Sequence, residues 1–328
     1  MNEPFPPIVR VRFMLETTEP ARLPAYAGSA WRGLLGHSLR RTVCVTRQPT
    51  CDGCLLTGTC AYSVFFESPP PTSDSAQRYT AVPHPFVLDV EATPARDLPS
   101  GQPLALGITL IGPAIELLPY LIQTVERAGL RGIGRSGGRF ALREVAAEPR
   151  LGSDSWERVY DAASRSYTRI TGVAPVAPVA PARPAPSVAL AFQTPLRIKR
   201  RGQFVGARDF TAADFLRNLH ARLSNLARFY GGTSDDSAWS PNSDDPPHMS
   251  AATLTWCDWT RFSSRQNTTM QMGGLLGTIV LAGTGLAAHW PALWLGQWTH
   301  VGKGTSFGLG KYRIDGEITD AVLRGEAQ

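Results

Sequence analysis

The strongest constraint on the fold of this chain is an internal repeat that relates a segment of its first half to a segment of its second half. Residues 119–145 align with residues 291–317 at a constant offset of 172 positions. Each copy predicts an amphipathic segment, then a glycine-rich basic loop, then a strand that carries an aromatic residue. We therefore expect two copies of one structural unit. The matched pairs are Leu121 with Leu293, Arg131 with Lys303, Gly132 with Gly304, Gly138 with Gly310, Arg139 with Lys311, Phe140 with Tyr312, and Leu142 with Ile314.

A proline-rich segment separates the two copies. Thr171–Ser187 contains the run Val173-Ala-Pro-Val-Ala-Pro-Val-Ala-Pro181, in which proline at every third position favours an extended, polyproline-like spacer without a core of its own. A chain of 328 residues is long enough for two domains. We predict an N-terminal domain over residues 1–170, a linker over residues 171–187 and a C-terminal domain over residues 188–328.

Hydrophobic periodicity gives the order of elements in each half. The first half predicts strand, helix, strand, strand, helix and strand, at residues 9–13, 29–44, 86–90, 104–110, 114–128 and 139–145. The second half opens with a strand at 188–192 and a helix at 211–230, where Thr211 and Asp214 form a capping box. The predicted fold class is α+β, with two tandem ferredoxin-like (RRM-like, βαββαβ) domains.

The composition of the chain indicates the charge of its partner and the compartment in which it is found. Its formal net charge of +6 favours a polyanionic partner. The N-terminus has no basic segment followed by an apolar core, so no signal peptide is expected. Residues 273–295 are the most apolar stretch, but they contain five glycines as well as His289 and Pro291. They predict a buried strand and a loop, not a membrane span. We expect a soluble, cytoplasmic protein with no membrane partner.

One histidine stands on the polar side of the first predicted helix. Apolar residues recur every four positions from Trp31 to Leu39 and form the buried stripe, and His37 lies opposite to it. Arg40 and Arg41 follow three and four residues later on the same face as His37. They would disfavour a protonated imidazole and neutralise a bound phosphate. The pattern fits an ordinary surface histidine and also a catalytic one.

Two basic segments of the second half are candidate RNA-contact sites. The first predicts a strand that runs into a hairpin with a charged tip, at Arg197, Lys199, Arg200 and Arg201. The second is a glycine-rich loop that permits close backbone approach to a phosphate, with Gly302, Lys303, Gly304, Gly308, Gly310 and Lys311 as candidates. A solvated hairpin and a tight structural turn are the alternatives. No GxxxxGK[ST] phosphate loop occurs, so no nucleotide cofactor is expected.

Four of the five cysteines lie within 17 residues, at Cys44, Cys51, Cys54 and Cys60. In a cytosolic chain such a cluster indicates a metal more than disulfides. Four thiolates complete a tetrahedral zinc site, which would hold the loop after the first helix together. An iron–sulfur cluster has similar requirements, and free thiols are the third possibility. Since four cysteines leave no open coordination position, we expect a structural metal and no cofactor for catalysis.

Several segments together resemble the RAMP-superfamily CRISPR-associated endoribonucleases that process repeat RNA, the CRISPR-associated protein six family. The resemblance covers most of both halves. It rests on Trp31-Arg-Gly-Leu-Leu-Gly-His37 followed by the cysteine cluster, on Phe192-Gln-Thr-Pro-Leu-Arg-Ile198, on residues 256–266, and on the glycine-rich segments 273–277 and 302–310.

This resemblance implies metal-independent cleavage of precursor CRISPR RNA within its repeats. The ribose 2′-OH attacks the neighbouring phosphate and leaves a 2′,3′-cyclic phosphate and a 5′-OH. By this likeness His37 is the general base, or the acid for the leaving oxygen, with His300 in reserve. Arg40 or Arg41 would stabilise the pentavalent phosphate, and Tyr26 would assist. The implied partners are a repeat stem-loop RNA and other CRISPR effector subunits.

Two further classes of protein remain open. A catalytically inactive RAMP subunit, which binds guide RNA inside an effector complex, would show the same basic loops and repeated fold. A general RNA-binding module of the RRM type is disfavoured, because the chain has no RNP1 segment of the form Lys/Arg-Gly-Phe/Tyr-Gly/Ala-Phe-Val.

Overall fold

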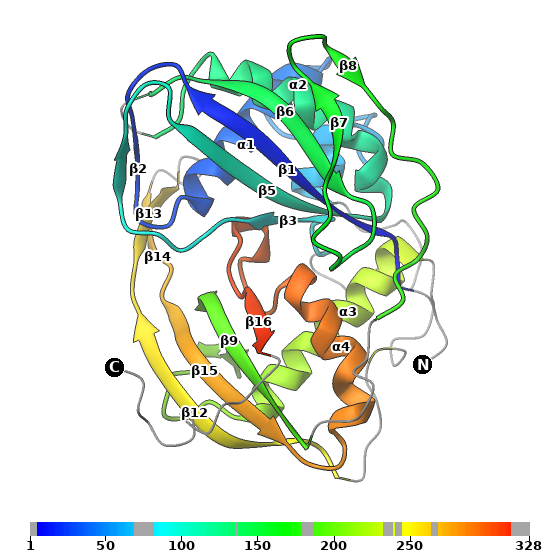
Figure 1. Cartoon of the computed structure of the whole chain (residues 1–328), viewed down its shortest axis with the longest axis vertical. Coiled ribbons are helices and arrows are strands. Elements are labelled where there is room, and N and C mark those ends of the chain that lie inside the picture. The colour runs from blue at the N-terminus through cyan, green and yellow to red at the C-terminus, as the bar shows by residue number, and fades with distance from the viewer. Residues whose placement is uncertain are drawn as a thin grey trace. The chain divides into compact units, whose positions relative to one another are not determined.

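The chain divides into two compact units in the computed structural model (Figure 1). Residues 4–176 and 226–232 form the N-terminal unit, and residues 1–3, 177–225 and 233–328 form the C-terminal unit. The structure describes residues 5–68, 82–134, 137–178, 186–231, 239, 245–263 and 268–315, and the side chains of residues 261–263, 268–270 and 315 are outside this description. Of the predicted linker 171–187, residues 179–185 lie outside the described residues.

The N-terminal unit is an antiparallel sheet with helices α1 and α2 on one face (Figure 1). The strand order is β3-β5-β1-β6-β7-β8, and β2 pairs with β4 separately. With α1 between β1 and β3 and α2 between β5 and β6, this is the ferredoxin-like βαββαβ order. The elements are β1 (Ile8–Thr17), β2 (Ala21–Leu23), α1 (Gly28–Val43), η1 (Ser63–Glu67), β3 (Phe86–Asp89), β4 (Arg96–Leu98), β5 (Pro103–Ile111), η3 (Gly112–Leu117), α2 (Leu118–Gly129), β6 (Phe140–Glu148), β7 (Glu157–Asp161) and β8 (Ser166–Tyr167).

The central strand β1 explains how this unit forms its core. Val11, Phe13 and Leu15 alternate with less buried residues and point to the same face. The buried side of α2, which includes Leu121 and Val125, supplies apolar residues to the unit's core. Burial of such aliphatic and aromatic side chains is the main stabilising contribution to a domain of this size.

The C-terminal unit repeats the same arrangement. Its antiparallel sheet has the order β12-β15-β9-β16, with α3 between β9 and β12 and α4 between β15 and β16. Rings of Phe192, Phe215 and Tyr312 pack at its centre, with 5.4 Å between the centroids of Phe215 and Tyr312. The elements are β9 (Ser187–Leu196), β10 (Lys199–Arg200), β11 (Gln203–Phe204), α3 (Ala212–Gly231), β12 (His248–Cys257), β13 (Thr260–Ser263), β14 (Thr268–Gln271), β15 (Gly274–Ala282), α4 (Leu286–Thr299), η4 (Thr305–Phe307) and β16 (Tyr312–Asp315).

The internal repeat lies at equivalent places in the two units, which confirms the predicted tandem ferredoxin-like fold. In each unit it comprises the second helix, a glycine loop and the fourth strand of the βαββαβ order. Gly132 and Gly304 both have φ +84°, a left-handed conformation that favours glycine. Phe140 begins β6 and Tyr312 begins β16, and both rings are buried.

Two local predictions have different outcomes. The capping box of α3 is confirmed, because the Asp214 backbone N–H donates to Thr211 Oγ1 and the Thr211 backbone N–H donates to Asp214 Oδ2. The apolar stretch 273–295 was expected to be a strand and a loop, but its second part begins helix α4 with Pro291 inside it. Burial of the helix outweighs the lost hydrogen bond of the proline. No helix of the described residues is long and apolar enough to cross a membrane.

Candidate functional site

Helix α1 presents His37 on the surface of the N-terminal unit. Trp31, Leu35 and Leu39 are buried in the unit's core, and the Trp31 ring packs edge-on against Phe140 at 5.6 Å between centroids. Because His37 lies on the opposite side of the helix from this stripe, its side chain is exposed. The predicted outward orientation is confirmed, and an exposed imidazole can reach a bound substrate.

The two arginines after His37 have different surroundings. Arg40 is half-buried, donates hydrogen bonds to the carbonyl oxygens of Gln48 and Pro49 at 2.5 and 2.7 Å, and lies over the Tyr62 ring. Arg41 is exposed. The guanidinium of Arg41 is therefore available to an anionic ligand, whereas that of Arg40 holds the loop that follows the helix.

Tyr26 does not fit a role in contact with RNA. Its side chain is only 5% exposed. Burial raises the pKa of the Tyr26 hydroxyl well above its usual range, and the nearby Asp89 carboxylate raises it further. A hydroxyl in this position stays protonated and enclosed, which does not suit the catalytic assistance expected of Tyr26.

A second histidine lies near α1 and was not identified from the sequence pattern. Arg32 of α1 lies 3.3 Å from His84 through its Nη2 atom, and His84 contacts the Ser68 hydroxyl at 3.0 Å through Nδ1. The Arg32 guanidinium also lies over the Phe66 ring. His84 lies two residues before β3. Its contact with Arg32 joins residues 52 positions apart in the chain, and no periodic pattern in the sequence predicts such a contact.

The predicted basic hairpin exists in the C-terminal unit. Strands β10 and β11 pair, and the turn between them has Arg201 at φ +52° and Gly202 at φ +85°. Such a pair of left-handed residues is typical of a two-residue hairpin turn. Lys199 and Arg201 are exposed. Arg200 is bound to Asp214 at 3.1 Å.

Arg197, at the base of this hairpin, is a correction to the expected RNA-contact set. Its side chain is buried, its Nη1 lies 2.8 Å from Met272 Sδ, and its guanidinium lies over the Phe204 ring. Buried polar groups are held by protein partners because their desolvation is costly. Arg197 therefore serves the packing of the hairpin.

The glycine-rich loop is shaped by its own internal contacts. Gly302, Gly304, Gly308 and Gly310 all have positive φ, and a Cβ atom at Gly310 would stand 1.8 Å from the Val301 carbonyl oxygen. Lys303 is exposed, while Lys311 is only 9% exposed. Among the loop's lysines, Lys303 is thus accessible to a ligand. The glycines are required by the tight turn, whatever else the loop binds.

His300, at the start of this loop, is enclosed by protein. Its side chain is 1% exposed and its Nδ1 lies 3.3 Å from the Leu309 carbonyl oxygen. This burial is incompatible with the reserve role in RNA cleavage, which requires contact with the ribose or the leaving oxygen.

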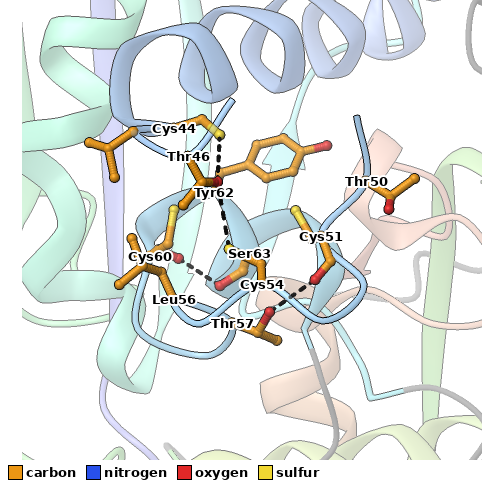
Figure 2. Close-up of a pocket in the computed structure, with 11 residues that line it drawn as sticks. Cys44, Thr46, Thr50, Cys51, Cys54, Leu56, Thr57, Cys60, Tyr62 and Ser63 are labelled. Carbon is orange, nitrogen blue, oxygen red and sulfur yellow. Dashed lines mark hydrogen bonds between the residues drawn. The ribbon is translucent and has the colours of Figure 1, made fainter. Parts of the chain in front are cut away.

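The four clustered cysteines line one pocket behind the C-terminus of α1 (Figure 2). All four are free thiols. The Thr46 hydroxyl lies between two of the sulfurs, 3.8 Å from Cys44 Sγ and 3.7 Å from Cys54 Sγ. Burial acts to raise the pKa of Cys44, but hydrogen bonds from Thr46, the Arg47 backbone and Arg40 hold this pKa below its usual value.

Two ferredoxin-like units in one chain, with accessible basic groups on each, define a tandem ferredoxin-like protein with cationic surfaces. Residues 190–312 match the family model described as CRISPR-associated endoribonuclease Cas6. Residues 5–171 match the model AF_1859_N, described as an N-terminal domain. The N-terminal half of the chain therefore belongs to the family of the AF_1859_N model, and residues 190–312 are similar to the Cas6 endoribonucleases.

Two solved structures and one relative are also similar to this chain. A partial Cas6-RT-Cas1–Cas2 complex and a Cas6-RT-Cas1–Cas2 complex each align with 96% of this chain at a TM-score of 0.52 and 14% identity, covering 47% and 29% of their own chains. At this identity the likeness shows the fold alone. An uncharacterized protein of Archaeoglobus fulgidus is 27% identical over 115 residues, which are 35% of this chain and 36% of the relative. These matches span less than half the length of each relative.

Proposed function

We propose that this chain is an endoribonuclease that cleaves precursor CRISPR RNA within its repeats and needs no metal for the chemistry. The match of residues 190–312 to the Cas6 endoribonuclease model supports the substrate class. The observation that carries the proposal is the exposed imidazole of His37 on α1, with the exposed guanidinium of Arg41 one helical turn further on. This combination supplies a proton-transfer group and a cation to one face of one helix.

The proposed reaction is an intramolecular displacement at phosphorus. The 2′-oxygen forms a bond to the neighbouring phosphorus, and the bond from that phosphorus to the 5′-oxygen of the next nucleotide breaks. Neutral His37 accepts the proton of the 2′-OH, or protonated His37 donates a proton to the leaving 5′-oxygen. The products are a 2′,3′-cyclic phosphate and a 5′-OH, and no further reactant is consumed.

Electrostatic stabilisation of the phosphorane is assigned to Arg41. The negative charge on the equatorial oxygens increases in the transition state, and a fixed cation stabilises it there. Three exposed cations of the C-terminal unit, Lys199, Arg201 and Lys303, are assigned to the RNA backbone. Arg40 is assigned to the support of the loop after α1, because its guanidinium is bound to two carbonyl oxygens of that loop.

The first experiment removes the imidazole. His37→Ala should lower the single-turnover rate on labelled repeat RNA by about 10²–10⁴, since a positioned acid or base contributes that much, while RNA affinity stays the same. His248→Ala removes another exposed histidine, on β12, and should leave the rate unchanged. If His37→Ala cleaves at the wild-type rate, the assignment of His37 is wrong. If the wild-type chain binds but never cuts its cognate repeat, the inactive RAMP subunit becomes the better assignment.

The second experiment tests the nucleophile. Replacing the ribose 2′-OH at the cut site with hydrogen should abolish cleavage and leave affinity largely intact, because the removed group is the attacking atom. Cleavage of the unmodified repeat should persist in excess chelator during a short incubation. Cleavage of the deoxy substrate, or formation of a product with a 5′-phosphate, would contradict the proposed chemistry.

A further inference from the structure

The segment after α1 is almost entirely exposed to solvent, including its apolar side chains. From residue 45 to residue 59 every residue is exposed except Cys51 and Cys54. Even its apolar residues point outward, with Leu55 97% exposed and Val45 75% exposed. A loop of this kind has no hydrophobic core that would offset the conformational entropy lost on ordering it. The two least exposed side chains of this segment, those of Cys51 and Cys54, both line the pocket.

The backbone brings these thiols to one place. Cys44 directly follows α1, and its N–H donates to the Arg40 carbonyl. Cys51 and Cys54 form a tight turn in which the Cys54 N–H donates to the Cys51 carbonyl at 3.2 Å. Cys60 begins the following helical segment, because its carbonyl accepts from the Val64 N–H at 3.0 Å. The first and last of these thiols are thus anchored to helical segments, and the turn carries the other two.

Figure 2 shows the four cysteine side chains around one pocket, with Thr46 between Cys44 and Cys54. Among the described residues no group of three or more His, Cys, Asp or Glu side chains is already close enough together to hold a metal. Tetrahedral zinc with Zn–S bonds of about 2.3 Å requires sulfurs roughly 3.8 Å apart. The sulfurs must therefore move closer together than they are here before four of them can share one ion. The exposed loop allows this adjustment because little side-chain packing opposes it.

We propose that the four cysteines of this loop bind one structural zinc ion. The thiolates complete a tetrahedral, closed coordination sphere, as structural zinc sites do. The ion supplies the cross-link that the loop's exposed apolar side chains do not. It fixes residues 44–60 against the end of α1, where Arg40 already binds the carbonyl oxygens of Gln48 and Pro49. This proposal does not rest on the proposed nuclease activity, since zinc content and RNA cleavage are measured separately.

The test is the metal content of the full-length chain purified without added chelator. Elemental mass spectrometry should give one zinc per chain, and blocking the thiols with a mercurial should release it to a chromophoric chelator. Replacing the zinc with cobalt should give the intense ligand-field bands of tetrahedral thiolate coordination. Cys51→Ser and Cys54→Ser should lose the zinc, whereas Cys257→Ser, which removes the thiol outside the loop, should keep it.

Three outcomes would overturn the proposal. One is a chain that contains no zinc and does not bind added zinc. Another is iron with acid-labile sulfide and visible charge-transfer absorption, which would identify an iron–sulfur cluster. The third is a pair of disulfides in the chain purified under reducing conditions. The zinc-release and cobalt measurements use the wild-type chain, so they decide the question even if a serine variant fails to fold.

Discussion

At the scale of single residues, Arg40 and Arg41 are adjacent in the sequence but differ in what their guanidinium groups contact. Arg41 is exposed, so Arg41→Ala should leave the unfolding free energy within about 0.5 kcal/mol of wild type. It should lower the single-turnover cleavage rate by about 10²–10³, the loss typical of one removed transition-state stabilising group. Arg40→Ala removes the two hydrogen bonds to the Gln48 and Pro49 carbonyls and should lower stability by about 1–2 kcal/mol.

Rates measured on repeat RNA and chemical unfolding of both variants separate these roles. Arg41→Lys, which keeps the charge without the planar guanidinium, should restore part of the rate. If Arg40→Ala and Arg41→Ala lowered the cleavage rate equally, the assignment of catalysis to Arg41 and of loop support to Arg40 would be wrong.

A second prediction concerns a buried ion pair between two neighbouring strands of the N-terminal sheet, β1 and β6. Arg10 of β1 binds both carboxylate oxygens of Glu148 at 3.1 Å, and both side chains are buried. Glu148→Ala leaves Arg10 with Asp89 at 3.5 Å and should destabilise the chain by about 3 kcal/mol, because the remaining buried charge has lost its main partner. Glu16→Ala breaks an exposed pair with Arg143 and should cost far less, because solvent screens an exposed ion pair. Chemical denaturation compares the two, and similar losses would contradict the difference in burial.

At the scale of elements, the glycine loop between α4 and β16 tests whether its glycines are structural. Gly310 has φ +74°, and a Cβ there would meet the Val301 carbonyl oxygen at 1.8 Å. Gly310→Ala should therefore cost more than about 3 kcal/mol, from backbone strain and steric overlap together. Gly202 has φ +85°, and a Cβ there would have no other atom within 4 Å, so Gly202→Ala carries the strain alone, about 1 kcal/mol. Equal unfolding midpoints in denaturant would show that the loop relaxes around the added methyl group.

The elements that could be predicted from the sequence are those with a regular spacing of apolar residues or with a copy in the other half of the chain. The fourfold spacing from Trp31 to Leu39 placed α1 within one residue at each end, and the same spacing correctly put His37 outside. Strands β7 and β8 were not predicted, because β8 has only two residues and β7 has two exposed residues beside two buried ones. Their pairing with β6 depends on contacts that no local pattern encodes.

The candidate site was predicted less completely than the fold. Four residues were selected for the chemistry of their side chains, but all four are buried in the structure. They are Arg197, Lys311, Tyr26 and His300. Their burial comes from segments distant in the chain, as when Arg197 meets Met272 across 75 positions. Helical periodicity predicts exposure on α1, whereas exposure in an irregular loop depends on tertiary packing that is absent from a local window.

At the scale of the whole molecule, one buried contact should control how stability depends on pH. His220 of α3 and His289 of α4 lie 2.9 Å apart, from Nε2 to Nδ1, and both are buried in the C-terminal unit. The Nδ1 of His220 contacts the Trp239 carbonyl oxygen, which can only accept a hydrogen bond. His220 Nδ1–H must therefore donate to this oxygen, and because the lowered pKa keeps His220 neutral, its Nε2 accepts from His289 Nδ1–H. This arrangement requires His220 to be neutral.

Burial, together with the neighbouring His289, lowers the pKa of His220 to about 4. In the unfolded chain a histidine titrates near its ordinary pKa of about 6.5. Between these two values the unfolded state binds more protons than the folded state, so stability falls as the pH is lowered from about 6.5 to about 4 and is fully present above that range. The loss should reach up to about 3 kcal/mol.

Urea unfolding of the wild type at a series of pH values measures this loss of stability, and His220→Gln should flatten the profile because the amide does not titrate. His248→Gln, an exposed histidine of the same unit, should leave the profile unchanged. A wild-type profile that matches that of His220→Gln across this range would mean that the histidine pair does not couple protonation to unfolding.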